Sequence, residues 1–356
     1  MRLACSLLIL LLFASTAHTQ VALTPPPPRT PAPAPLPHPV LDRIHAAQAL
    51  NCGVVKEEED FSRATDHGNR SAFDIDLCKA VAVAVLGPGA KLVIKNYPDE
   101  PYGVRALRIG EIDLLATASP TVANTAIDLV FTRPVFYDGQ GILTTNDPAR
   151  KSPLDLAGKK VCFLTGSAAE DGLHAYAEAH HITYLWYPFS EAGEMEAAFF
   201  TGNCDAVTGD ISQLANTHNI DPRRAKDFKV LPQLIRQDPL AMTSLGVDVR
   251  FAAIVSWTVE TLVEGEELGI TMKNAKSLAT TTPRPELQAV LGQRYGSGTA
   301  LGLDPHWGAN VIGAVGNYGE IFDRDLGPES ALGLDRGENR LWTDGGLLYG
   351  ILPHSR

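Results

Sequence analysis

Apolar runs and amphipathic stretches alternate along the chain from about residue 41 onward. Residues 50–54 (LNCGV) form a short continuous apolar run, which predicts a buried strand. The stretch 73–86 that follows carries apolar side chains every four residues, at Leu77, Val81 and Val85. This spacing predicts a helix with one buried face, and therefore a first β-α unit.

The same order of elements recurs further along the chain. Residues 105–117 predict the end of a helix, a stop at Gly110 and then a strand from Ile112 to Ala116. Residues 159–166 (KKVCFLTG) predict another strand, the stretch after Ser167 a helix, and residues 204–210 (CDAVTGD) a further strand. This alternation predicts two α/β lobes with mainly parallel sheets and right-handed crossovers, with a ligand crevice at the carboxyl ends of the strands.

A last helix is predicted near the carboxyl terminus. Its apolar residues recur at spacings of three and four, with small Gly313, Gly316 and Gly319 among them. We expect it to pack closely against the first lobe through Trp307, Val311, Val315, Tyr318 and Phe322.

Length and composition narrow the class of protein. The 356 residues are 45% apolar and 20% charged, which excludes a disordered polymer, a fibre and a polytopic membrane protein. At roughly 100 to 200 residues per domain, this length fits two lobes. The net charge is -11 and the sequence has no cluster of Lys or Arg, so nucleic acid is not an expected partner.

The first residues have the features of an export signal. Arg2 precedes an apolar run from Leu7 to Ala14, and the small residues Ser15 and Ala17 follow at the spacing of a signal-peptidase site. We therefore expect residues 1–17 to be a secretory signal that is cleaved on export; the resemblance described below implies that the mature protein then lies in the periplasm. A membrane anchor is the alternative, but the run is far shorter than the roughly 20 apolar residues that span a bilayer.

A proline-rich spacer is predicted over residues 18–40. From Pro25 to Pro39, nine of fifteen residues are proline, which favours a polyproline II rod of roughly 45 Å. We expect this rod to separate the folded body from whatever precedes it. A proline-rich docking peptide is the alternative function for the same composition.

Four cysteines remain once the predicted signal is removed. Cys52 and Cys78 fall on the first strand and first helix, whereas Cys162 and Cys204 fall on two strands of the second lobe. Of the three possible pairings, Cys52 with Cys78 and Cys162 with Cys204 keeps each bridge inside a lobe, and export supplies an oxidising compartment. Four buried thiols are the alternative.

Patterns that would indicate a metal or a cofactor are weak. The sequence has no CxxC or HExxH spacing for zinc. His174, His180 and His181 surround a predicted helix end with no matching ligand elsewhere, so we expect them to be solvated. The glycines of residues 296–302 (GSGTALG) do not follow a clear strand, which argues against a dinucleotide site. We expect no cofactor and no metal.

Several blocks of the sequence together resemble a known family. They are similar to the periplasmic general L-amino-acid-binding proteins of ABC importers, which belong to solute-binding protein family 3. The similarity runs from about residue 41 to 352 and includes all four mature cysteines. Its blocks are LNCGV, FDIDLCKAVAVAV, FYDGQG (136–141), CDAVTGD, AVGNYGEIF (314–322) and LWTDGGLLYG (341–350), of which the terminal GNYGEIF is the most specific.

The resemblance implies a periplasmic-binding-protein-like fold of two lobes joined by a two-strand hinge. Lobe one would comprise 41–139 and 240–356, and lobe two 140–239. The chain would leave lobe one near Gly139 to Gly141 and return near Pro239 to Gly246. A monomer of this kind closes on a free amino acid between the lobes and presents it to an ABC permease in the inner membrane.

The resemblance also indicates which residues of lobe two bind the ligand. Asp210 matches the position that pairs with the α-amino group, although Asp is also a preferred N-cap for a helix beginning at Ile211. The turn of Thr165, Ser167 and Ala168 joins a strand to a helix and offers backbone N–H groups to the ligand carboxylate. Ser167 with Glu170 equally fits a capping box that needs no ligand.

Lobe one departs from the family pattern. The family places a hydroxyl-rich turn there, followed by an arginine that clamps the ligand carboxylate. Here Ser119 and Thr121 supply the hydroxyls, but Asn124 or Thr125 stands in place of the arginine. Losing one partner of a buried charge pair typically costs about 2 to 5 kcal/mol. Arginines that could compensate are Arg63, Arg70, Arg105 and Arg133.

An aromatic wall and two alternative functions complete the prediction. Phe61, in the loop after the first strand, corresponds to a family residue that covers the ligand side chain, whereas ordinary core packing is the alternative for it. Periplasmic cyclohexadienyl dehydratases share the fold and would need a general acid such as Glu170 or His174. Because the arginine is missing, a divergent receptor for a ligand other than an amino acid is the other alternative.

Overall fold

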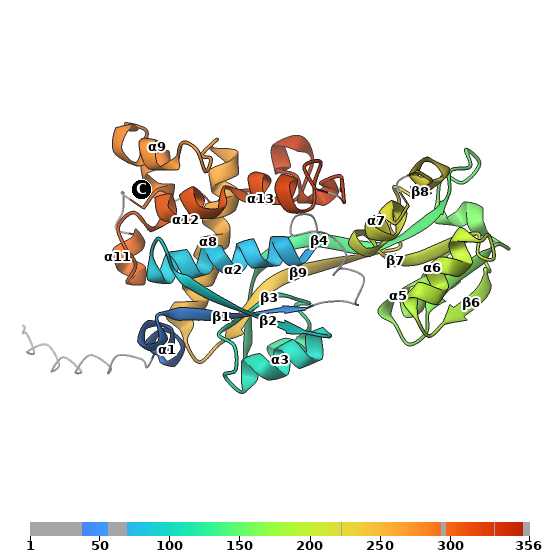
Figure 1. Cartoon of the computed structure of the whole chain (residues 1–356), viewed down its shortest axis with the longest axis horizontal. Helices are drawn as coiled ribbons and strands as arrows, with labels where there is room; N and C mark the ends of the chain where they lie inside the picture. The colour runs from blue at the N-terminus through green and yellow to red at the C-terminus, as the bar shows by residue number, and fades with distance from the viewer. Residues whose placement is uncertain (1–37, 56–69, 222, 293–296, 331, 352–356) are drawn as a thin grey trace, which may run out of the picture. The chain divides into compact units, whose positions relative to one another are not determined.

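The computed structural model describes residues 38–55, 70–221, 223–292, 297–330 and 332–351 (Figure 1). Within these ranges the strands join into one sheet in the order β2-β1-β3-β9-β4-β7-β5-β6, with β8 beside β4. The strands are β1 (Ala49–Val55), β2 (Lys91–Tyr97), β3 (Leu114–Ala118), β4 (Leu129–Thr145), β5 (Lys160–Leu164), β6 (Leu185–Phe189), β7 (Ala206–Asp210), β8 (Phe228–Val230) and β9 (Arg236–Leu245).

The helices of the described chain cover both ends of this sheet. Those of predicted lobe one are α1 (Pro39–Ala47), α2 (Arg70–Leu86), α3 (Glu100–Arg108), α4 (Val122–Thr125), α8 (Val249–Glu267), α9 (Ala275–Thr281), α10 (Pro285–Val290), α11 (Ser297–Leu301), α12 (Trp307–Val315) and α13 (Tyr318–Asp325). Those of predicted lobe two are α5 (Ala168–Ala179), α6 (Ala192–Phe200) and α7 (Ile211–Asn219). We keep the names lobe one and lobe two for these groups, and the residue boundaries stay a prediction.

Strand β1 is parallel to β2 and β3, as the β-α alternation predicts. Helix α2 buries the predicted face of Leu77 and Val81 against this sheet. On the other face α3 packs through Val104 and Leu107. Gly110 adopts a left-handed φ of +73° just past α3, and β3 begins two residues later than predicted. The first β-α unit of the sequence prediction is therefore confirmed.

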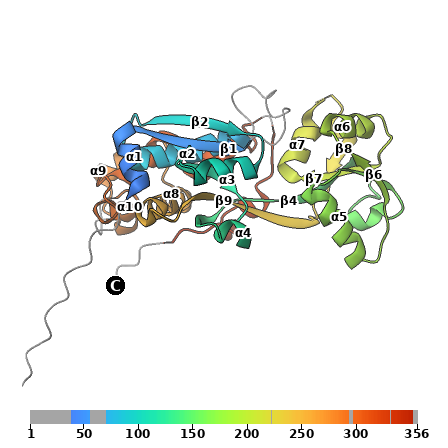
Figure 2. The same cartoon turned by 90° about the horizontal axis from the view of Figure 1, so that it is seen from below.

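Lobe two has a hydrophobic core on each face of its sheet. Alternate residues of β5 divide between the two cores: Val161 and Phe163 face α5, whereas Cys162 faces α6. β5 is parallel to β6 and β7, so this lobe has the same β-α-β order of elements as lobe one. Figure 2 shows α5, α6 and α7 gathered around these strands. The α/β fold of two lobes with mainly parallel sheets is confirmed.

Two long antiparallel strands run between the lobes. β4 has 17 residues and pairs with β9 from Leu129 opposite Leu245 to Gln140 opposite Arg236. Beyond that point β4 pairs with β7, from Gln140 opposite Asp210 onward. Figures 1 and 2 show these strands side by side. The same β4 strand therefore contributes to the sheet of both lobes.

Both predicted disulfides are present, so the alternative of four thiols is wrong. Cys52 in β1 is bonded to Cys78 in α2, and Cys162 in β5 to Cys204 just before β7. Each bridge closes a loop inside one lobe, with sequence separations of 26 and 42. The bridges therefore stabilise each lobe without restricting movement between the two.

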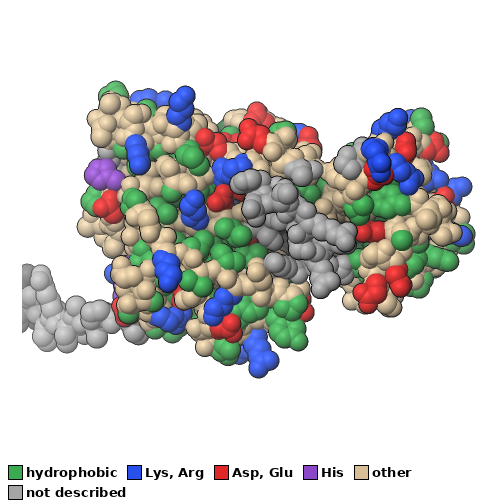
Figure 3. All heavy atoms as spheres, viewed as in Figure 1, with side chains coloured by type: hydrophobic (Ala, Val, Ile, Leu, Met, Phe, Trp, Pro, Cys, Tyr) green, Lys and Arg blue, Asp and Glu red, His purple; other side chains and the backbone are tan. Residues whose placement is uncertain are grey.

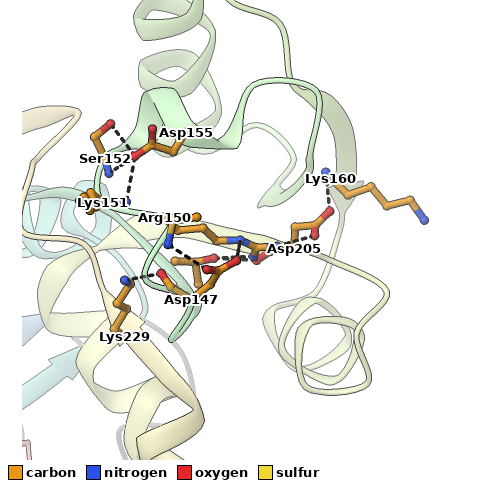
Figure 4. Close-up of polar contacts among 10 residues, drawn as sticks. Asp147, Arg150, Lys151, Ser152, Asp155, Lys160, Asp205 and Lys229 are labelled. Atoms are coloured by element: carbon orange, nitrogen blue, oxygen red, sulfur yellow. Dashed lines mark hydrogen bonds and ion pairs between the residues drawn. The ribbon is translucent and has the colours of Figure 1, made fainter.

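Next to the second bridge, a polar cluster ties three strands together (Figure 4). The Arg150 guanidinium donates to Asp205 Oδ1 at 3.0 Å and to the Thr144 hydroxyl at 2.9 Å. The other oxygen of Asp205 accepts the Lys160 backbone N–H at 3.0 Å. Because these residues stand at the end of β4 and the starts of β5 and β7, the cluster fixes the edge of the lobe-two sheet. Its role is structural.

The prediction of a single carboxyl-terminal helix is wrong, because the structure has two helices in this stretch. Gly316 has a φ of +92°, which ends α12. Asn317 then caps α13, accepting the Glu320 N–H while the Glu320 carboxylate accepts the Asn317 N–H, both at 2.9 Å. Both pieces still pack on lobe one, where Tyr318 and Phe322 surround the ring of Phe73. That ring is fully buried core.

Acidic and basic side chains are interspersed over the face drawn in Figure 3. In the described part of the chain, every helix is too short or too polar to cross a membrane.

Candidate functional site

A small cavity lies where the carboxyl ends of three strands meet. Its volume is about 30 Å³, the space of about one water molecule. Residues at the ends of β1, β3 and β7 line it together with residues of the crossing strands β4 and β9, which is the crevice position that the strand order predicts. The lining residues are Val55, Glu100, Thr117, Ala118, Ser119, Asp138, Asp210, Asp238 and Leu240.

Asp210 is the last residue of β7 and lines this cavity. It occupies the N-cap position of α7 with an extended backbone, but its side chain makes no capping hydrogen bond. The capping alternative therefore does not account for the carboxylate. Its pairing with a ligand ammonium stays a prediction.

The amino end of α7 is held by Asp138 of β4 instead. Asp138 Oδ2 accepts the Ser212 hydroxyl hydrogen bond at 2.6 Å, and Oδ1 faces the Ser212 N–H at 3.4 Å. Both side chains are buried, with exposed fractions of 4% and 1%. In the sheet Asp138 stands directly opposite Asp238 of β9. Two acidic residues therefore lie side by side where the strands cross.

The predicted lobe-one turn is built around a carboxylate. Ser119 follows β3 directly, and its backbone N–H donates to Glu100 Oε2 at 2.9 Å. The Asn124 amide donates to Glu100 Oε1 at 2.7 Å and to the Ser119 carbonyl at 2.9 Å. Thr121 caps α4 by accepting the Asn124 N–H at 3.1 Å. Of the three predicted residues, Ser119 lines the cavity, whereas Thr121 and Asn124 shape the turn behind it.

Two of the arginines that could replace the family clamp are placed elsewhere. Arg105 is exposed on α3. Arg133 pairs with Glu260 of α8 at 3.0 Å and lies 4.7 Å from the ring centre of Tyr349. Arg63 and the side chain of Arg70 lie outside the described residues. Of the described residues that line the cavity, none is a Lys, Arg or His.

The lobe-two turn has the capping geometry that its sequence allows. Ser167 accepts the Glu170 N–H at 3.2 Å, and its hydroxyl donates to the Leu164 carbonyl at 2.7 Å. The Glu170 carboxylate accepts the Gly166 N–H at 2.6 Å, rather than the Ser167 N–H of a standard capping box. The turn formed by Thr165, Ser167 and Ala168 does not line the 30 Å³ cavity. Its role in binding a ligand carboxylate stays a prediction.

Three further residues of the sequence prediction are Phe61, His174 and Glu170. Phe61 lies outside the described residues. His174 is exposed on α5, and its ring centre lies 4.1 Å from that of Trp186. Neither His174 nor Glu170, the acids considered for a dehydratase, lines the cavity. Across the described chain there is no group of three His, Cys, Asp or Glu side chains placed to hold a metal ion.

A second cavity, of about 820 Å³, lies between α7, β8 and the segment 332–339. The Asn339 side chain accepts the Tyr137 N–H at 2.7 Å and donates to the Tyr137 carbonyl at 2.9 Å, so it occupies both backbone groups of one residue of β4. Asn219 of α7 donates to the Leu332 carbonyl at 2.9 Å. The carboxyl-terminal segment therefore contacts both the crossing strand and lobe two.

The sequence patterns did not point to Glu100, Asp138 or Asp238. Asp138 and Asp238 are each the single acidic residue of their strand, next to Gly139 and Pro239, and this was the available signal. Glu100 follows Asp99 at the start of a helix, where acids are common, so nothing in the sequence set it apart.

Comparisons with known proteins agree with this architecture. No protein-family model matches the chain. It is 36% identical over 314 residues to the general L-amino acid-binding periplasmic protein AapJ of Rhizobium johnstonii, covering 87% of this chain and 91% of that protein. It is 34% identical over 311 residues to the glutamate/glutamine/aspartate/asparagine-binding protein BztA of Rhodobacter capsulatus, with the same coverage of 87% and 91%.

A solved structure shares the fold over nearly its whole length. It is an ABC transporter periplasmic binding protein from Brucella ovis with glutathione bound, 33% identical, with a TM-score of 0.73 over 88% of this chain and 98% of that one. Two α/β lobes joined by crossing strands, with a cavity lined from both, define a two-lobed solute-binding protein. The chain belongs to the family of periplasmic amino-acid-binding proteins of ABC transporters. The resemblance in the sequence is therefore confirmed.

Proposed function

We propose that the chain captures a free amino acid or a related small polar solute between its lobes and delivers it to an ABC permease. The observation that carries this proposal is the position of Asp210. Its carboxylate lines a cavity shared by both lobes, at the carboxyl end of β7, and is not used as a helix cap. A ligand that binds both lobes stabilises their closed arrangement by its differential affinity, which a partner can detect.

The division of roles in the cleft follows from charge. The ligand ammonium pairs with Asp210, whereas a ligand carboxylate needs N–H donors. The start of α5, at Ser167 and Ala168, presents first-turn N–H groups and the positive end of the helix dipole. The Glu170 carboxylate accepts the Gly166 N–H, which precedes these two residues. The carboxylate site of the solute therefore falls on lobe two.

The compartment and assembly state belong to the same proposal. Residues 1–17 act as a cleaved signal, the mature protein works as a monomer in the periplasm, and the proline-rich residues 18–40 space it from its surroundings. The relative AapJ and the Brucella ovis protein are both named as periplasmic binding proteins. Sequencing the amino terminus of protein recovered from a periplasmic extract tests the cleavage after Ala17, and light scattering tests the monomer.

The proposal also states that the chain is a receptor and not an enzyme. The relatives named above are binding proteins. Glu170, one acid that a dehydratase could use, is held at the lobe-two turn, away from the cavity.

A calorimetric titration of the refolded mature protein tests the function. The ligands are the twenty amino acids, prephenate and glutathione, the last because a structural neighbour carries it. Saturable heat with an amino acid and no turnover supports the proposal. Progressive loss of prephenate supports the dehydratase, and binding of glutathione alone supports a divergent receptor. No heat with any of these solutes contradicts the proposal.

A further inference from the structure

Glu100 occupies the hydrogen-bond donors that lobe one turns toward the cleft. Its two carboxylate oxygens accept from the Ser119 backbone N–H at 2.9 Å and from the Asn124 amide at 2.7 Å. Glu100 and Ser119 both line the cavity shared with lobe two. Two donors that converge on one carboxylate form the arrangement by which a protein binds a carboxylate ligand. Here the carboxylate is the protein's own.

Helix α3 begins at Glu100 but does not use the Glu100 side chain as its cap. Helix α3 is capped by the neighbouring Asp99, whose side chain accepts the Tyr102 N–H at 3.0 Å. Asp99 is exposed, whereas Glu100 is half-buried and directed to the turn after β3. The two adjacent acids therefore have different roles, one in capping α3 and one in the cleft.

The occupied donors change what lobe one can bind. A ligand carboxylate placed at this turn would meet the like charge of Glu100 and would find the Ser119 and Asn124 donors already used. A like-charge contact in a desolvated interface is strongly unfavourable. A carboxylate has about four acceptor positions, and the two hydrogen bonds above use two of them. A cationic donor on the ligand can use the others.

We propose that Glu100 is a specificity-determining residue of the cleft, and that it selects solutes with a second cationic group, such as the side-chain ammonium of lysine or the guanidinium of arginine. The inference rests on the proposed function, because it concerns the same cleft. The ligand's α-ammonium lies at Asp210, its carboxylate lies at the lobe-two turn, and the side-chain cation faces Glu100. Lobe one then needs no arginine at position 124 or 125.

A matched pair of ligands tests the selection. Lysine and norleucine have side chains of similar length, but norleucine lacks the terminal ammonium. Calorimetry on the mature protein should give a dissociation constant at least thirtyfold lower for lysine than for norleucine, and glutamate should bind more weakly than either. Thirtyfold is the low end of the cost of truncating one partner of a buried, hydrogen-bonded charge pair.

Two variants assign the preference to Glu100. Glu100→Ala should reduce the affinity for lysine at least thirtyfold and leave that for norleucine within a fewfold. Glu100→Gln keeps the shape and removes the charge, so it should give the same loss if the alanine variant folds poorly. Asp99→Ala is the control, because it removes the α3 cap without touching the cleft and should leave the lysine-to-norleucine ratio unchanged.

Each possible result decides between the two proposals. If wild-type protein binds norleucine or glutamate as tightly as lysine, or if both Glu100 variants keep the wild-type ratio, the selection by Glu100 is wrong and the receptor function stands. If none of the twenty amino acids binds the wild-type protein, the selection by Glu100 is wrong, and the receptor function is also wrong if glutathione gives no heat.

Discussion

Asp138 of β4 holds the first turn of α7 by accepting the Ser212 hydroxyl hydrogen bond at 2.6 Å, across 74 residues of sequence. Asp210, which precedes that helix directly, makes no capping hydrogen bond with it. Asp138 of β4 therefore holds the start of α7, a role that the local sequence predicts for Asp210. This exchange leaves the Asp210 side chain at the cavity between the lobes.

Replacing Ser212 with alanine should destabilise the protein. The substitution removes a buried donor from the Asp138 carboxylate, and hydrogen bonds to charged groups contribute about 1.5 to 3 kcal/mol. We expect a fall of that size in the free energy of unfolding, measured by urea denaturation. Ser277→Ala is the control, since Ser277 is exposed and its hydroxyl donates to the Asn274 carbonyl at 2.9 Å within the same helical region. Equal midpoints for the two variants would show that the Asp138–Ser212 contact contributes little.

Replacing Asp210 with alanine should separate binding from stability. The melting temperature of the ligand-free variant should fall by no more than the loss of a helix cap, about 1 kcal/mol, would explain. Amino-acid affinity should fall at least thirtyfold, the low end for a lost charge partner. Asp221→Ala, which breaks a surface pair with Arg223, is the matched control and should bind normally. Undiminished affinity in Asp210→Ala would place the ammonium partner elsewhere.

The elements of the fold could be predicted because their signals are local. The run of β1, the four-residue spacing of α2 and the strand before Ser167 each lie within a short window. The single error in the last helix also had a local signal, since Gly316, Asn317 and Glu320 together form a glycine stop and a capping box. Apolar periodicity alone continued through that break, because α12 and α13 both bury the same kind of side chain.

The contacts that shape the site could not be predicted in this way. Asn339 reaches Tyr137 across 202 residues, and Asn124 reaches Glu100 across 24. Such pairs depend on which strand ends meet in the sheet, and periodicity carries no information about partners so far apart. For the same reason the sequence showed that an arginine is missing from the lobe-one turn, but not that a glutamate holds that turn.

Removing either disulfide should weaken its own lobe. In the chain-entropy model, loops of 26 and 42 residues correspond to about 3.5 and 4 kcal/mol of stabilisation. We expect the double variants Cys52→Ser with Cys78→Ser, and Cys162→Ser with Cys204→Ser, each to lose stability of this order in urea. A reducing agent should lower the urea midpoint of the wild type by a similar amount. It should not change the midpoint of a variant that lacks all four cysteines. An unchanged wild-type midpoint under reduction would contradict this prediction.

Glu264 should make the stability of the protein fall as the pH rises above about 5. Burial in α8 raises its pKa from 4.5 to about 8, and the nearby Glu260 and Glu267 add to the shift. Between these two pKa values the folded chain keeps a proton that the unfolded chain releases, so the stability present below pH 4.5 is progressively lost up to about pH 8. One such proton corresponds to at most about 1.4 kcal/mol per pH unit. Glu264→Gln stays neutral, and its unfolding free energy relative to the wild type should rise between pH 5 and pH 8.

The control for this pH dependence is Glu286→Gln. Glu286 is a half-buried residue whose pKa is lowered, first by a backbone hydrogen bond and then by Arg284, so it stays ionised in both states throughout this range. Its variant should follow the wild-type pH profile between pH 5 and pH 8. Urea denaturation at four pH values measures all three proteins. If the difference between Glu264→Gln and wild type is constant with pH, Glu264 is ionised in the folded protein, and the carboxylate must then have a partner that compensates for its burial.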